Sequence, residues 1–385
     1  MSNNLVSVRA ELLTWARKRA GLEIFNLEQR FPKLAEWEAG ESQPTLVQLE
    51  SFAHAVHVPI GYLFLPRPVQ ETMPIPDFRT VADRSVTRPS PDLLDTLYLC
   101  QQRQDWYRNY ALMQRFSTLD FVGSATIDND PVTVAEALGA TLRFSLEERR
   151  RLPNWTDALR LFIAKTEDAG VLVMASSIVG SNSRRKLDVE EFRGFALADN
   201  LAPLIFLNAS DSKAARMFTL AHELAHLWLG ESGISNTETG RLPAHGIERW
   251  CNAVAAELLM PIDDARKAYR PALSLQEEIQ RLAQLFKVST LVALRRLFDA
   301  GFIDEPALRQ TYREEMAKIR AHDRSGSGGG DFYRTLGART GKRFARALLA
   351  DTLEGQTLFQ DAFRMLGIKK SAAFYQAARG LKVIS

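Results

Sequence analysis

The residues best suited to do chemistry are two histidines and a glutamate within one apolar stretch. His222, Glu223 and His226 follow the order His-Glu-x-x-His. Residues four apart share a face of a helix, so His222 and His226 can hold one metal ion between their imidazoles. Glu223 follows the first histidine and can act as general base toward a water on that metal. The pattern is typical of a zinc-dependent peptidase.

Two core histidines beside an unrelated glutamate are the simpler explanation of this motif. Burying the Glu223 carboxylate without a partner would cost several kcal/mol, whereas a metal site gives all three polar groups a role. The flanking residues are uncharged, as a helix buried on most sides requires. They are Phe218, Leu220, Ala221, Leu224, Ala225 and Leu227. The sequence therefore favours the metal site.

A catalytic zinc ion takes three protein ligands and keeps a fourth position for water. A third histidine six residues after His226 would complete one common version of the motif. That position is Ser232, and the position of the accompanying glycine is Leu229. The three-histidine version is therefore excluded, and a carboxylate further along the chain is the remaining route.

A second helix, ending before Pro261, carries the candidates for the third ligand. Glu248 and Asn252 are spaced i, i+4 and share a face. We expect Glu248 to bind the metal and Asn252 to hydrogen-bond a ligating histidine. Glu257 is a competing ligand. Its alternative role is that of a solvated carboxylate or a buried partner of an arginine.

Apolar runs before the metal-binding helix predict strands at residues 170–174 and 203–207. A sheet edge can bind a peptide as an added strand. The possible substrate strand is Leu204, Ile205, Phe206 and Leu207. The alternative is that both runs are buried sheet without substrate contact. His245 is a candidate for binding the oxyanion, or else an ordinary loop histidine.

Three blocks of the sequence together resemble the ImmA/IrrE metallopeptidases. They are residues 203–208, 221–226 and 248–261, within a similarity that spans about residues 150–300. The resemblance implies a zinc enzyme with Glu248 as third ligand and with helix-turn-helix repressors as the known class of substrate. The sequence departs from the family at Trp250 and Cys251, where Glu and Ala are common.

Residues 1–66 are similar to the XRE-type helix-turn-helix domain, above all in Trp37-Glu38-x-Gly40 before Pro44. The span from Gly21 to Gly40 is shorter than usual for that domain, so the module is degenerate. Residues 31–50 carry Lys33 against four glutamates, a net charge of −3. An acidic surface repels phosphates, which favours protein docking or dimerisation over DNA binding. Arg17, Lys18 and Arg19 could still contact a DNA backbone.

A basic helical region is predicted at residues 324–385, after the Gly/Ser-rich stretch 325–330. It carries eleven Lys and Arg against four Asp and Glu, a net charge of +7. Such a region can bind nucleic acid or an acidic protein, or can be a helical subdomain with a solvated basic face.

At 385 residues the chain is too long for one core. We expect the N-terminal module, a connector and helical region at 67–149, a peptidase domain at 150–323 and the C-terminal region. The fold class is α+β, mostly helical, with a small gluzincin-like core of a short sheet and the zinc helix. No apolar run approaches 18 residues, no signal peptide is evident, and Cys100 and Cys251 look like reduced core thiols. These features predict a cytoplasmic protein.

The sequence thus predicts a regulatory zinc endopeptidase that cleaves a specific protein, such as a repressor or a partner protein. Resemblance to chains of this whole architecture implies an alternative. In it, the protein is antitoxin-like or regulatory and binds a toxin partner, such as a PIN-type ribonuclease, or DNA, and the zinc site is secondary. Self-association is compatible with both.

Overall fold

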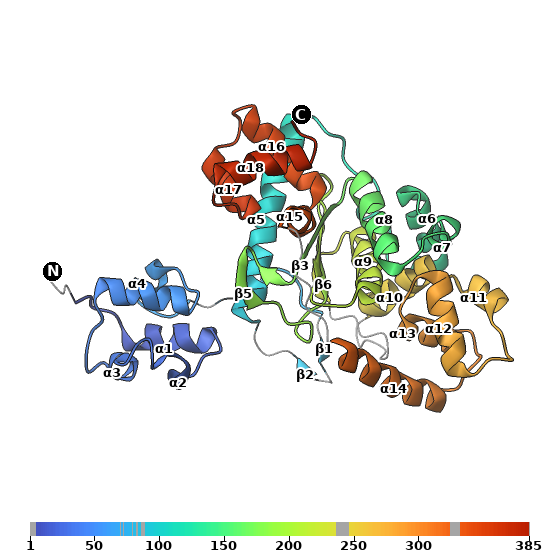
Figure 1. The fold of residues 1–385 in the computed structure, drawn as a ribbon, viewed down its shortest axis with the longest axis horizontal. Helices are drawn as coiled ribbons and strands as arrows, with labels where there is room; N and C mark the ends of the chain where they lie inside the picture. The colour runs from blue at the N-terminus through green and yellow to red at the C-terminus, as the bar shows by residue number, and fades with distance from the viewer. Residues whose placement is uncertain are drawn as a thin grey trace. The chain divides into compact units, whose positions relative to one another are not determined.

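The computed structural model describes residues 5–69, 71, 73–78, 80–81, 84–85, 89–235, 246–323 and 332–384. The chain divides into two compact units (Figure 1). The first comprises Met1–Pro74 and Thr87–Asp95, and the second comprises Ile75–Val86 and Thr96–Ser385. Among the described residues, none of the helices combines the length and the apolar character needed to cross a membrane.

The first unit is a small helical bundle around its own apolar core. Its elements are α1 (Ala10–Arg19), α2 (Ile24–Leu27), α3 (Leu34–Ala39), α4 (Leu46–Ala55) and the 3₁₀ helix η1 (Ile60–Phe64). Thr45 begins α4 with a capping box: its hydroxyl accepts from the Gln48 amide, and the Gln48 side chain accepts from the Thr45 amide. Leu12, Leu49 and Phe52 are fully buried in the core.

The basic run at the end of α1 is largely used inside this unit. Arg17 is buried and donates from Nε and Nη2 to the Glu38 carboxylate at 2.7 and 2.8 Å. Arg19 pairs in the same way with Glu71. Lys18 alone of the three is exposed. Two of the three predicted phosphate contacts are therefore already paired with carboxylates.

The second unit contains a mixed four-stranded sheet with the order β3-β7-β6-β8. The strands are β3 (Leu172–Ser176), β7 (Leu204–Asn208), β6 (Gly194–Leu197) and β8 (Gly233–Ser235). β3 and β7 are parallel, and the other pairs are antiparallel. Two small ribbons pair β1 (Thr80–Val81) with β2 (Arg84–Ser85), and β4 (Ile178–Val179) with β5 (Asn182–Lys186).

The strand order corrects one prediction. Leu204–Leu207 lie in β7, which is hydrogen-bonded to β3 on one side and to β6 on the other. Both edges of β7 are occupied, so this strand has no edge to offer a substrate peptide. Its residues are buried throughout, which matches the alternative of a buried sheet strand.

Helices make up most of the second unit, in agreement with the predicted α+β class. They are α5 (Pro91–Met113), α6 (Pro131–Leu142), α7 (Leu146–Arg150), α8 (Trp155–Asp168), α9 (Lys213–Leu229), α10 (Gly246–Leu259), α11 (Ile262–Ala268), α12 (Leu275–Phe286), α13 (Thr290–Asp299), α14 (Glu305–Asp323), α15 (Phe332–Thr340), α16 (Lys342–Leu353), α17 (Phe359–Leu366) and α18 (Ser371–Gly380). The helix α5 begins in residues assigned to the first unit. Figure 1 shows α8 and α9 on one side of the sheet and α5 and α15 on the other.

The two cysteines lie in helices of the second unit, Cys100 in α5 and Cys251 in α10, and both are free and buried. The prediction of core thiols is confirmed. Burial raises the pKa of the Cys100 thiol to about 12. Burial and the nearby Glu248 and Glu223 carboxylates raise the pKa of Cys251 well above its ordinary value.

Candidate metal centre

The helix α9 places the two histidines of the motif on one buried face. Ser212 caps its start by accepting from the Ala215 amide at 3.2 Å, and Gly230 ends it in the left-handed conformation. His222 and His226 are both 0% exposed. Their rings lie 4.8 Å apart, and the two Nε2 atoms are 3.1 Å from each other. Both imidazoles therefore point at the same place.

The helix α10 brings a carboxylate to that place. Glu248, in its first turn, is 4% exposed. Its Oε1 lies 3.0 Å from His226 Nε2, and its Oε2 lies 3.3 Å from His222 Nε2. Burial alone would raise the pKa of Glu248, but the two histidines outweigh burial and hold that pKa far below its ordinary value. Glu248 is therefore ionised where it meets the histidines.

The spacing of these three groups fits one tetrahedral metal ion. Zinc bonds of about 2.0–2.1 Å at the tetrahedral angle separate neighbouring ligand atoms by roughly 3.3–3.4 Å. The two Nε2 atoms are 3.1 Å apart, and the Glu248 carboxylate lies across them, with Oε1 3.0 Å from His226 Nε2 and Oε2 3.3 Å from His222 Nε2. Two imidazoles and one carboxylate also form a donor set that catalytic zinc uses, with a fourth position left for water.

Asn252 fixes the orientation of His222. The Nδ1 atom of His222 lies 2.9 Å from Asn252 Oδ1, a carbonyl oxygen that only accepts, so Nδ1 carries the proton. The other ring nitrogen, Nε2, faces the Glu248 carboxylate, where it could bind a metal ion. A metal ion bound there could accept electron pairs from both imidazoles and from the carboxylate. The contact between Asn252 and His222 is the one expected from the i, i+4 spacing of Asn252 to Glu248.

Glu223 lies beside the ligands rather than among them. It is 0% exposed, and within the described part of the chain neither of its carboxylate oxygens has a hydrogen-bond partner. Burial, and next the charge of Glu248, raise the pKa of Glu223 well above its ordinary value, and the nearby Ser235 partly offsets this. A carboxylate with a high proton affinity next to a metal-binding cluster is suited to take a proton from water.

Glycine at position 194 makes room for Glu223. A Cβ atom on Gly194, at the start of β6, would lie 3.0 Å from Glu223 Oε1 and 2.6 Å from Thr219 Cγ2. The helix α9 therefore packs closely on β6 at the motif itself. Nothing in the spacing of the sequence pointed to Gly194.

Two further residues at the site come from other segments, and the sequence assigned neither of them a role there. Ser235, the last residue of β8, places its hydroxyl 3.2 Å from His222 Nε2 and 3.4 Å from His226 Nε2. Phe78 stacks its ring on the His226 imidazole, with centroids 5.7 Å apart and planes 12° apart. Both reach the metal centre through strand pairing, which leaves no signature in local spacing.

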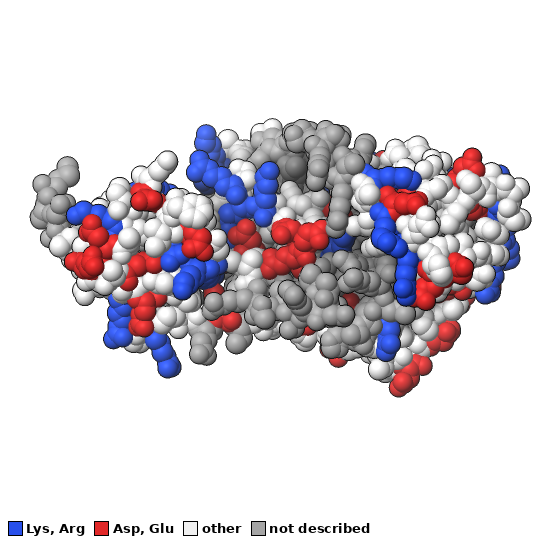
Figure 2. All heavy atoms as spheres, turned by 90° about the horizontal axis from the view of Figure 1, so that it is seen from below, with Lys and Arg blue, Asp and Glu red and all other residues white. Residues whose placement is uncertain are grey.

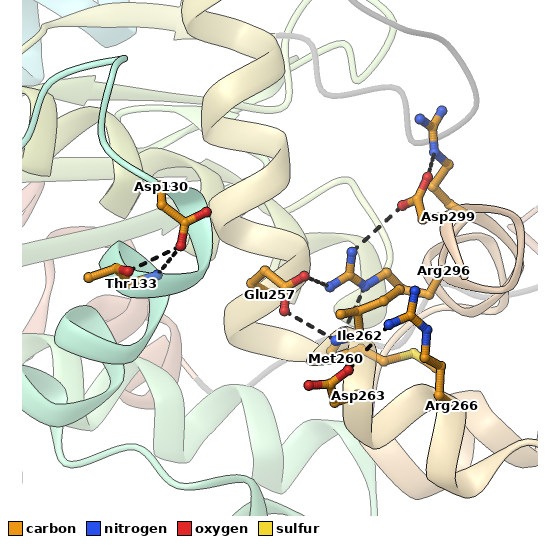
Figure 3. Close-up of polar contacts among 10 residues, drawn as sticks. Asp130, Thr133, Glu257, Met260, Ile262, Asp263, Arg266, Arg296 and Asp299 are labelled. Atoms are coloured by element: carbon orange, nitrogen blue, oxygen red, sulfur yellow. Dashed lines mark hydrogen bonds and ion pairs between the residues drawn. The ribbon is translucent and has the colours of Figure 1, made fainter. Parts of the chain in front are cut away.

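The competing carboxylate Glu257 lies at the other end of α10 and takes no part in the cluster. It pairs with the buried Arg296 and accepts from the Ile262 amide at 3.1 Å (Figure 3). Arg296 also donates to the Met260 carbonyl at 2.8 Å. Glu257 is thus the buried partner of an arginine, one of the two alternatives to metal binding, and it anchors α13 to the end of α10. His245 lies outside the described residues, so its assignment to the oxyanion stays a prediction.

Comparison with known proteins agrees with this geometry. Residues 166–298 match the family model of the IrrE N-terminal-like domain, a metallopeptidase family. The matched range holds the whole His222, His226 and Glu248 cluster, but it begins well after Phe78. Residues 340–380 match a domain of unknown function (DUF8813). A search of curated proteins found no match.

Proposed function

We propose that the protein is a zinc-dependent regulatory endopeptidase that cleaves a specific protein target. The observation that carries the proposal is the buried cluster of His222, His226 and Glu248, in which each Nε2 atom lies 3.0–3.3 Å from an oxygen of the Glu248 carboxylate. The match to a metallopeptidase family over the same residues supports it. Zinc is the proposed metal because two imidazoles and one carboxylate are three ligands of a kind that it takes at catalytic sites.

The residues of this chain divide the work of hydrolysis. A metal held by the three ligands supplies Lewis acidity to a water and to the scissile carbonyl. Glu223 takes the proton of the attacking water and passes it to the leaving amine. Asn252 keeps His222 in the tautomer that ligates. The raised pKa of Glu223 matches this role, because the group must bind a proton and then release it.

The regions outside the peptidase domain would select the target, a repressor or another partner protein, rather than do chemistry. In the first unit Arg17 and Arg19 are paired with glutamates, which weakens a role in binding phosphates. On the face that Figure 2 shows, Lys and Arg are interspersed with Asp and Glu among the described residues. Because Arg17 and Arg19 are already paired with carboxylates, we favour a protein partner.

The test is Glu223→Gln in the full chain, co-expressed with the product of the neighbouring gene. We expect the variant to keep one zinc per chain, measured by elemental analysis. Loss of general-base catalysis should slow cleavage of the partner by about 10²–10⁴-fold. Glu136→Gln, at an exposed position on α6, is the matched control and should cleave normally.

Proteolysis retained by Glu223→Gln would overturn the mechanism. A neighbour that co-purifies intact with both wild type and variant would instead support the antitoxin-like alternative, in which binding neutralises the partner.

A further inference from the structure

The outer edge of β8 is partly covered by a short stretch of the second unit. The sheet ends at β8, which pairs with β6 on its inner side. On its outer side, the Phe78 amide donates to the Ile234 carbonyl and the Ile234 amide donates to the Pro76 carbonyl, both at 3.1 Å. Residues 76–78 thus run parallel to β8 at a single bridge between Asp77 and Ile234.

The side chain of Phe78 lies between Gly233 and the imidazole of His226, beside the metal centre. Its ring stacks on His226 at 5.7 Å and lies directly over Gly233. A Cβ atom on Gly233 would be 2.3 Å from the Phe78 ring, so glycine is required for the ring to sit there. A flat ring between a glycine backbone and an imidazole is a place shaped for an aromatic side chain.

The segment lies closer to the surface than the strand that it covers. Pro76 and Asp77 are exposed, and Phe78 is partly buried. Ile234, the residue they pair with, is fully buried. Segments with few buried contacts and solvent-exposed hydrogen bonds are the ones that open most readily. The cover of β8 is therefore more exposed to solvent than the strand that it covers.

We propose that residues 76–78 are an intramolecular occupant of the edge where the protein binds its substrate polypeptide. An incoming extended chain would displace them and pair with Ile234, as strand addition requires. The place between Gly233 and His226 would select an aromatic side chain in that chain. This inference rests on the proposed function, since it assigns the substrate class and the self-inhibition of the same site.

Two arguments favour an aromatic peptide as the occupant. The edge already holds one, so backbone geometry and ring position are both demonstrated by residues of this chain. Position 233 has no side chain of its own, so the ring of the occupant must supply the apolar cover of His226. Residues 76–78 are part of the same chain, so they compete at an effective concentration on the order of millimolar. An incoming chain therefore binds weakly until these residues dissociate from β8.

The test measures peptide binding without cleavage. The full chain carries Glu223→Gln and is loaded with zinc, and the probe is a fluorescein-labelled peptide with the sequence of residues 73–81. Anisotropy gives its dissociation constant. Adding Phe78→Ala to the protein should tighten binding at least about tenfold, because the competitor loses its ring. Phe78→Leu, which keeps apolar volume without a flat ring, should tighten it less.

Two further arms test the aromatic place. A probe with alanine in place of its phenylalanine should bind the Phe78→Ala protein at least about tenfold more weakly than the original probe. Gly233→Ala, combined with Phe78→Ala, should reduce the affinity of the original probe to that of the alanine probe. Phe359→Ala removes a partly exposed aromatic ring on α17 and is the matched control, expected to bind like the parent.

Equal binding by the parent and the Phe78→Ala protein would overturn the proposal. So would equal binding of the two probes, or no effect of Gly233→Ala. Circular dichroism confirms that each variant is folded, and Phe78→Leu provides the comparison should Phe78→Ala unfold. Since no arm measures cleavage, a failure to find proteolysis would overturn the proposed function and leave these binding results standing.

Discussion

The two edges of the four-stranded sheet are covered in different ways. At the β3 edge, the Leu172 amide is used for β7, so the Val173 carbonyl points outward, and a Cβ atom on Gly341 would lie 2.8 Å from it. The turn between α15 and α16 therefore closes directly on that edge. At the β8 edge, residues 76–78 lie against the strand, with backbone hydrogen bonds to Ile234 and the Phe78 ring stacked on His226.

The residues that cover the β3 edge are also more deeply buried than those that cover the β8 edge. The helical cover of β3 includes Phe344, which is 0% exposed, and Arg103, which is 2% exposed. Arg103 donates from Nε and Nη2 to the Met365 carbonyl at 3.1 and 2.8 Å, and so ties α5 to the end of α17. An open strand edge invites pairing with other chains. One edge is thus sealed by a core, and the other is left for an exchangeable strand beside the metal centre.

Phe344→Ala should produce the largest loss of stability, because it empties a fully buried site in the cover of β3. Truncating a core phenylalanine costs about 3–5 kcal/mol of unfolding free energy. Urea denaturation measures this, with Phe359→Ala, at a partly exposed position, expected to cost less than about 1 kcal/mol. A small effect of Phe344→Ala would show that the β3 cover is no core.

Removal of the metal should loosen the β8 edge and spare the β3 edge. A ligand at about 100 times its dissociation constant stabilises the folded state by about 3 kcal/mol, which a chelator removes. Ser235 connects β8 to both histidines, so the Ile234 amide should exchange its hydrogen faster after chelation. The Leu172 amide should not. Equal loss of protection at both edges would contradict the contrast.

Replacing Gly341 at the β3 edge or Gly233 at the β8 edge by alanine should cost different amounts of stability, because one cover is fixed and the other can move. In Gly341→Ala the new methyl meets the Val173 backbone at a residue with φ of 76°, so we expect a loss of about 2–3 kcal/mol. In Gly233→Ala the methyl meets the Phe78 ring, which can swing away, so the loss should be about 1 kcal/mol. Thermal melts of both variants measure the difference. Equal losses would indicate that residues 76–78 are held as firmly as α16.

The smallest expected effect is a pH dependence at the β3 side. Burial raises the pKa of Glu167, and hydrogen bonds from the Arg343 and Lys342 amides only partly offset this. A raised folded-state pKa gives stability that is present below the ordinary value of 4.5 and is lost as pH rises through the folded value. Glu167→Gln removes this ionisation. The variant should therefore gain stability relative to wild type between about pH 4.5 and 7, as melts across that range would show. A constant difference would assign the carboxylate no net burial penalty.

The core of the metal centre could be predicted because its parts are local. His222 and His226 share a helix turn, and Glu248 and Asn252 share another, so spacing alone places each pair on one face. Packing of two helices then brings the pairs together. Because Ser232 occupies the position of a third ligating histidine, the sequence pointed to a carboxylate as the third ligand.

The parts that were missed or mistaken depend on strand pairing. Ser235 and Phe78 reach the ligands only because β8 and residues 76–78 lie side by side at the end of the sheet. The apolar run Leu204–Leu207 left an edge strand and a buried strand open, and a strand that is apolar on both faces is typical of the buried centre of a sheet. Register and strand order are properties of distant segments, which one-dimensional spacing does not contain.

The two buried thiols can report how often their surroundings open. Cys251 lies in α10 between Glu248 and Asn252, and Cys100 lies in α5 near Arg103. Neither thiol is exposed, so a thiol reagent can reach each one only when its surroundings open. The modification rate of Cys251 therefore reports how often the metal centre opens. The modification rate of Cys100 reports how often the surroundings of α5 open. Both can be followed in the unmodified chain, without any introduced label.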